Sequence, residues 1–269
     1  MKLSRFFLAN LPVMLSALLV MPVSAHTPFL APISFTPAHE SWVSLDAGFA
    51  EVFFQPDVAF DKGDFQLLTP AGVWQKPGRL EAFKTRTLIE HQLTEKGTYR
   101  FSTGLRYGAV FRFYELNGER KAIRDPKEAL PAGAKLVDHY QSVTLAETYI
   151  TNDKPTAVAL KPYSKGLEVV PVTHPSDVYA GEKFAVKVLL DGKPLANKEI
   201  SVFKAQDGSE HEKPYLNATT NTKGEAELAM ADTGIYLLHT RHTAPAPKNA
   251  EAPNYGYVYT LSFQVEPAL

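Results

Sequence analysis

The sequence predicts an all-β protein in which two tandem β-sandwich domains, of immunoglobulin-like or transthyretin-like type, follow a cleaved signal peptide. Short segments rich in aromatic and β-branched residues recur along the chain, with Gly, Pro, Asn or Asp between them. No stretch of ordinary helix length shows helical periodicity. A glycine-tyrosine motif also occurs once in each half. Together these features favour repeated sandwiches over any helical fold.

The first 25 residues have the three parts of a secretory signal peptide. Lys2 and Arg5 give a positive start, residues 6–20 are apolar, and small residues precede a cleavage position after Ala25. The apolar run is shorter than the ~20 residues that a membrane-spanning helix needs. We therefore expect an exported, periplasmic protein that begins at His26 and does not span the membrane.

Composition excludes several kinds of partner and site. Cleavage removes two basic residues and leaves 26 basic against 29 acidic side chains, so nucleic acid is not an expected partner. The chain has no cysteine, which excludes thiolate metal sites and disulfides. No phosphate-binding glycine loop or serine nucleophile motif is present, and we predict neither a catalytic residue nor an organic cofactor.

We assign residues 26–160 to the first domain. Asn117-Gly118 predicts a two-residue hairpin turn. Residues 124–136 hold two prolines and a glycine, which indicates a loop with one short helical turn at 127–129. The clearest strands of this domain are expected at residues 42–45, 65–68, 99–101 and 110–114.

Residues 161–269 form the second predicted domain, and its pattern is more regular. Asp191-Gly192 predicts another hairpin turn. The joint between the domains is placed at residues 152–165, where prolines and glycines interrupt the strand periodicity. Strands are expected around residues 181–188, 200–203, 222–226 and 260–265.

The repeated motif supports a core position for two tyrosines. Residues 95–101 and 232–238 each contain a glycine, a tyrosine two positions later and an apolar residue two positions further on. In a strand this spacing puts the tyrosine and the apolar residue on one face. We expect that face to point into a sandwich core in each domain.

Several motifs resemble a known family of exported two-domain proteins that is associated with periplasmic nickel and cobalt uptake, a nickel-uptake transporter family of largely unknown function. The resemblance implies a metal-binding accessory component that serves a membrane metal-uptake complex. It covers essentially all of the chain after the signal peptide. The motifs that carry it are Ala25-His26-Thr27-Pro28, residues 85–93, residues 97–102, Arg124-Asp125-Pro126, residues 172–175, residues 191–195 and Thr240-Arg241-His242.

His26 is the strongest candidate metal ligand, because cleavage would make it the first residue. Its free α-amine and its imidazole could then close a chelate ring on Ni(II), Co(II), Cu(II) or Zn(II). Pro28 has no amide hydrogen, which excludes the three-residue copper and nickel clasp. The competing interpretation is a solvated terminus that binds nothing.

Other histidines must complete such a site. His91 lies at the end of a predicted strand, on the same face as Thr87 and Ile89, and suits the rim of a sandwich. His239 and His242 are three positions apart on one strand and point to opposite faces, and the family pattern favours His242. The predicted metal set is therefore His26, His91 and His242, with Glu90 able to join or orient it. His39, His139, His174 and His211 are interpreted as surface or turn residues.

Three functions remain open from the sequence. The leading one is a metal-binding accessory protein, not an enzyme, that binds a divalent ion through His26 and strand histidines. The first alternative is a copper-dependent oxidative enzyme that uses a histidine brace, as in polysaccharide monooxygenases. The second is a metal-free interaction module that docks on a membrane complex.

Overall fold

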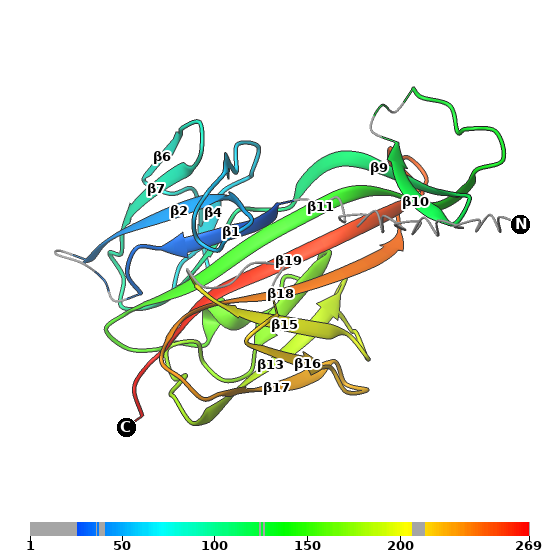
Figure 1. Cartoon of the computed structure of the whole chain (residues 1–269). Helices are drawn as coiled ribbons and strands as arrows, with labels where there is room; N and C mark the ends of the chain where they lie inside the picture. The colour runs from blue at the N-terminus through cyan, green and yellow to red at the C-terminus, as the bar shows by residue number, and fades with distance from the viewer. Residues whose placement is uncertain are drawn as a thin grey trace, which may run out of the picture.

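The protein is almost entirely β-structure, arranged as one large sheet between two smaller ones (Figure 1). The computed structural model describes residues 26–35, 37, 41–123, 125, 127–205 and 213–268. These residues form a ten-stranded, a five-stranded and a four-stranded sheet. We name them the central sheet, the first outer sheet and the second outer sheet. The all-β prediction is confirmed, and the predicted signal peptide lies outside the described residues.

The first outer sheet is built from the N-terminal part of the chain. Its main path runs β1-β2-β7-β6, and β3 pairs with β2. All pairs in it are antiparallel. The strands are β1 (Thr27–Pro32), β2 (Trp42–Ala50), β3 (Val58–Ala59), β6 (Arg79–Ala82) and β7 (Thr87–Gln92).

The central sheet combines strands from both halves of the sequence. Its order is β16-β15-β18-β19-β11-β8-β4-β5, with the β9–β10 hairpin on the first part of β11. β11 and β19 pair in parallel, and the chain between them passes through the second outer sheet. The strands are β4 (Gln66–Leu68), β5 (Trp74–Gln75), β8 (Gly97–Ser102), β9 (Arg106–Leu116), β10 (Glu119–Ile123), β11 (Lys135–Asn152), β15 (Glu199–Lys204), β16 (Leu216–Thr219), β18 (Gly234–Pro245) and β19 (Asn254–Val265).

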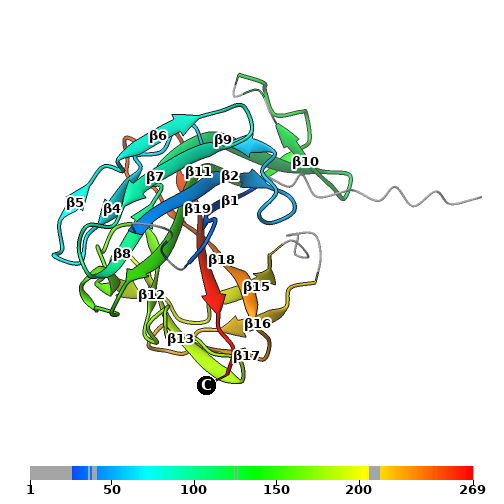
Figure 2. The same ribbon diagram turned by 90° about the vertical axis from the view of Figure 1, so that its left-hand side faces the viewer.

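The second outer sheet lies on the other side of the central sheet, as Figure 2 shows. Its central strand, β13, pairs with β12, β14 and β17. The strands are β12 (Leu167–Pro171), β13 (Glu182–Leu190), β14 (Lys193–Pro194) and β17 (Glu225–Met230). A 3₁₀ turn at Val158–Leu160 precedes β12.

Alternation along β11 divides the interior into two main cores. Leu145 and Tyr149 belong to the core under the second outer sheet. Ala146 and Ile150 belong to the core under the first outer sheet. Successive side chains of a strand point to opposite faces, so one strand serves both cores. The predicted division at residue 160 falls in the connection between β11 and β12, and the two domains as such stay a prediction.

The predicted turns are present where the sequence places them. Asn117 and Gly118 have φ values of 54° and 79° and join β9 to β10. Asp191 and Gly192 have φ values of 49° and 76° and join β13 to β14. Positive φ at both central residues is what a type I′ hairpin turn requires. The helical turn expected at 127–129 is replaced by a single turn in which the Glu128 amide donates to the Asp125 carbonyl.

The repeated motif forms the same structure twice. Tyr99 and Tyr236 are both buried, one in each main core. The Tyr99 hydroxyl donates to the Glu95 carbonyl at 3.2 Å, and the Tyr236 hydroxyl donates to the Asp232 carbonyl at 2.9 Å. Each ring therefore fastens the turn four residues before it, as a tyrosine corner does in immunoglobulin-type sandwiches.

Candidate functional site

A cavity of about 640 Å³ opens on the face of the central sheet that β1 covers. Its floor comes from alternate residues of β11, namely Tyr140, Ser142 and Thr144. The sheet register places Gly256 beside Ser142 and Val258 beside Thr144, and all of these residues line the cavity. The walls come from β2, β3, β9, β10 and β18. The site therefore uses segments that lie far apart in the sequence.

His26 reaches this cavity because β1 is fastened across β19. The Thr260 hydroxyl donates to the Pro28 carbonyl at 2.9 Å, and the Ser262 hydroxyl donates to the Leu30 carbonyl. His26 directly precedes β1 and lines the cavity. Its Nδ1 lies 3.1 Å from Oδ2 of Asp57, and 39% of its side-chain surface is exposed. The imidazole is therefore held by a carboxylate and open to solvent.

His242 lines the same cavity from β18. β15 pairs with β18 only as far as His239, so β18 has no β15 neighbour at His242. Strand alternation places the His242 side chain on the face of β18 opposite to that of Arg241, and His242 lines the cavity at the edge that β15 leaves open. Burial, and then the charge of Lys198, lower the pKa of His242. A lowered pKa favours the neutral imidazole, which is the form in which histidine binds metals.

His91 lies away from the cavity, on β7. The Gly78 amide donates to its Nδ1 at 3.1 Å, and its Nε2 lies 3.4 Å from Nε2 of Gln75. The ring contacts Tyr99 and Phe101 edge-on. Both ring nitrogens therefore have protein neighbours. The structure brings His26 and His242 to one cavity and places the third predicted ligand elsewhere.

The remaining histidines have ordinary structural surroundings. His174 contacts the Thr98 hydroxyl at 2.9 Å, and its Nδ1 accepts the Ser176 amide at 3.0 Å, as befits a turn residue. His239 accepts the Arg241 Nε hydrogen at 3.0 Å. His39 and His211 lie outside the described residues. Within the described part of the chain, no group of three or more His, Cys, Asp and Glu side chains is arranged to hold a metal ion.

Sequence reasoning missed the cationic character of the cavity. Among the described residues that line it are four cations and two carboxylates. Each carboxylate forms an ion pair with one of the cations. The four cations are far apart in the sequence and have no characteristic spacing. Only Arg241 belongs to a motif that carries the family resemblance, Thr240-Arg241-His242. The cations are Arg106, Arg120, Lys198 and Arg241, and the carboxylates are Asp61 and Asp138.

A family model described as a domain of unknown function, DUF4198, matches residues 23–244. The match covers most of the chain and includes His26, His91 and His242. The chain belongs to the DUF4198 family. The expected membership of a family of unknown function is thereby confirmed, while the link of this DUF4198 chain to nickel and cobalt uptake stays a prediction. A search of curated proteins found no match.

Comparison with solved structures finds matches at low sequence identity and low TM-score. The D0-D1 domain of intimin is 12% identical, with 87% of this chain and 96% of that chain covered and a TM-score of 0.20. The FN1-FN3 domains of chicken CNTN1 are 10% identical, with 89% and 98% covered and a TM-score of 0.25. Among the residues described for this DUF4198 member, no helix is long and apolar enough to cross a membrane.

Proposed function

We propose that this protein is a periplasmic metal-binding accessory protein whose cavity binds one divalent transition-metal ion through His26 and His242. The observation that carries the proposal is that both histidines are among the residues that line one cavity. They lie near opposite ends of the mature sequence, so a shared cavity is not a consequence of sequence proximity. The ion is cargo, and nickel or cobalt is the class that the family resemblance favours.

The donor set fits such an ion when the signal peptide has been removed. His26 then supplies an amine and an imidazole nitrogen, and His242 supplies a second imidazole. Three nitrogen donors suit nickel, cobalt, copper and zinc. Asp57 contacts Nδ1 of His26 at 3.1 Å, the ring nitrogen that would close the chelate with the amine, so a bound ion would replace this contact and lie beside the Asp57 carboxylate. His26 and His242 can thus supply three nitrogen ligands, the number that three separate side chains usually supply.

The positive lining opposes a bare cation, and this limits where the ion can bind. Asp61 and Asp138 offset two of the four lining cations through ion pairs with Arg106 and Arg120. The His26 end has Asp57 in addition. We therefore place the ion at His26, with His242 as the second ligand.

Calorimetric titration with nickel, cobalt, copper and zinc tests the proposal. Protein that begins at His26 should bind one ion per chain. One additional residue before His26, or the change His242→Ala, should weaken binding at least tenfold. His91→Ala is the matched control, because it removes a histidine outside the cavity, and it should bind as the wild type does. Equal binding by all four proteins, or none by any, would contradict the proposal.

A further inference from the structure

The cavity is much larger than a metal ion requires. Its volume of about 640 Å³ falls within the range of about 300–1,000 Å³ that small-molecule sites occupy. A water molecule takes about 30 Å³ in the liquid, so an ion with its water ligands would leave most of the space unused. The remaining lining residues therefore indicate what else the cavity could hold.

One wall of the cavity is aromatic and rests directly on backbone. The rings of Phe111 and Tyr140 are 5.6 Å apart between centroids, on paired positions of β9 and β11. A Cβ atom on Gly256 would lie 2.4 Å from Cδ2 of Tyr140. The Tyr140 ring can lie over β19 only because residue 256 has no side chain. This packing keeps the ring against the sheet and the space above it open.

The lining is also positively charged. The two carboxylates that face the cavity are already paired, Asp61 with Arg106 at 3.8 Å and Asp138 with Arg120. Lys198 and Arg241 bring the count of cations two above that of carboxylates among the described lining residues. Such a surface attracts an anion to the part of the cavity away from the His26 end.

Arg241 is oriented by a histidine on the same strand. Its Nε donates to Nε2 of His239 at 3.0 Å, and burial lowers the pKa of His239 to about 3. This contact fixes the guanidinium plane. A guanidinium can form two parallel hydrogen bonds with a carboxylate.

We propose that the cavity binds a small aromatic carboxylate, with Arg241 and Lys198 at the carboxylate group and Tyr140 and Phe111 against the ring. The Tyr140 hydroxyl is a further hydrogen-bond donor there, because burial raises its pKa and keeps it protonated. Aromatic rings add packing that an aliphatic acid of equal charge does not obtain. This binding does not depend on the metal.

Binding of benzoate to the metal-free mature protein tests the inference, by calorimetry in the presence of a chelator. Benzoate should bind with a Kd below about 1 mM. Benzamide, which has the same shape without the charge, and cyclohexanecarboxylate, which has the charge without the aromatic ring, should each bind at least fivefold more weakly. Failure of benzoate to bind, or equal binding of benzamide, would overturn the inference. If the mature protein binds benzoate but no metal ion, the proposed function is wrong and the present inference stands.

Variants locate the site. Lys198→Met and Arg241→Gln should each weaken benzoate at least tenfold, and Lys193→Met, on an exposed lysine of β14, is the matched control with no change. Gly256→Ala should also weaken benzoate, because it pushes the Tyr140 ring into the cavity while every charge stays. If Arg241→Gln does not fold, Lys198→Met and Gly256→Ala still decide the question. Benzoate affinity unchanged in these two variants would contradict the assignment.

Discussion

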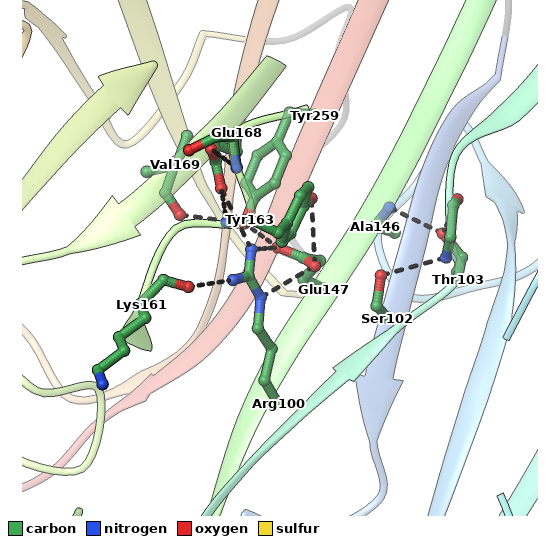
Figure 3. Close-up of polar contacts among 12 residues, drawn as sticks. Arg100, Ser102, Thr103, Ala146, Glu147, Lys161, Tyr163, Glu168, Val169 and Tyr259 are labelled. Carbon is green, nitrogen blue, oxygen red and sulfur yellow. Dashed lines mark hydrogen bonds and ion pairs between the residues drawn. The ribbon is translucent and has the colours of Figure 1, made fainter. Parts of the chain in front are cut away.

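Arg100 and Glu147 form a two-point ion pair in the interior, with Nε to Oε1 at 3.0 Å and Nη2 to Oε2 at 2.5 Å (Figure 3). Neither side chain has any exposed surface. The Tyr259 hydroxyl donates to Oε2 of Glu147 at 2.7 Å, and Nη1 of Arg100 donates to the Lys161 carbonyl at 3.2 Å. The pair thus joins β8, β11, β19 and the connection to β12, which links both halves of the chain.

Removal of the Glu147 charge should be strongly destabilising. Glu147→Gln removes the hydrogen-bonded counter-ion of Arg100 and leaves only Glu168, 3.9 Å away, and the free energy of unfolding should fall by about 3–5 kcal/mol. Chemical denaturation followed by circular dichroism measures this. The control is Glu119→Gln, which removes an exposed ion pair with Lys121 and should leave the free energy of unfolding almost unchanged. Similar losses in the two variants would contradict a stabilising role for the buried pair.

Glu168 should make stability depend on pH in a particular direction. Burial raises its pKa, with the nearby charge of Arg100 acting against this. A carboxyl whose pKa is higher in the folded state binds its proton more tightly there. Its contribution to stability is then full below its unfolded pKa of about 4.3 and is lost as pH rises through the folded value.

Glu168→Gln isolates this contribution. The variant cannot titrate, and its single side-chain oxygen can accept only one of the two amides, of Tyr163 and Ser164, that donate to different oxygens of Glu168, so a constant loss of stability at all pH values is expected in addition. Denaturation at a series of pH values should show the wild type losing stability relative to the variant as pH rises from about 4. A constant difference between them would show that Glu168 has an unshifted pKa.

The two repeated tyrosines should contribute independently. Tyr99→Phe and Tyr236→Phe each remove one hydroxyl that donates to a backbone carbonyl. Each change should lower the free energy of unfolding by about 1 kcal/mol. The two lie in different cores, so the losses in the double variant should add within about 0.5 kcal/mol. Strong non-additivity, measured by the same denaturation, would mean that the two cores are energetically coupled.

Thr260 should influence metal binding without touching the metal. Thr260→Val keeps the shape of the side chain and removes the hydrogen bond to the Pro28 carbonyl. β1 then loses one of the contacts that place His26 at the cavity, and metal affinity should fall several-fold. Thr219→Val, on an exposed position of β16, is the matched control and should bind metal normally. Unchanged affinity in Thr260→Val would indicate that β1 is positioned by other contacts.

Local patterns in the sequence predicted much of the fold. The Asn117-Gly118 and Asp191-Gly192 turns and the core positions of Tyr99 and Tyr236 depend on neighbouring residues, and the structure has all of them. Joining of both halves into one central sheet was not predictable. The parallel pairing of β11 with β19 connects residues more than a hundred positions apart and has no local signature.

The same limit applies to the site. The histidine at residue 26 and the one at residue 242 were chosen for their chemistry, and the structure brings both to one cavity. His91 had equally suitable chemistry, but its strand belongs to the first outer sheet, where Gly78 and Gln75 occupy its ring nitrogens. Lys198 had no signal in the sequence and Arg241 was part of a motif without a predicted role, because the positive charge of a cavity depends on how strands from different parts of the chain assemble.

Pulsed electron paramagnetic resonance of the copper-loaded mature protein tests the central claim most directly, since it counts the imidazoles bound to the ion. With one equivalent of Cu(II), the protein that begins at His26 should show two coordinated imidazoles, and His242→Ala should show one. A spectrum with two imidazoles in His242→Ala, or with none in the wild type, would contradict a metal site shared by His26 and His242.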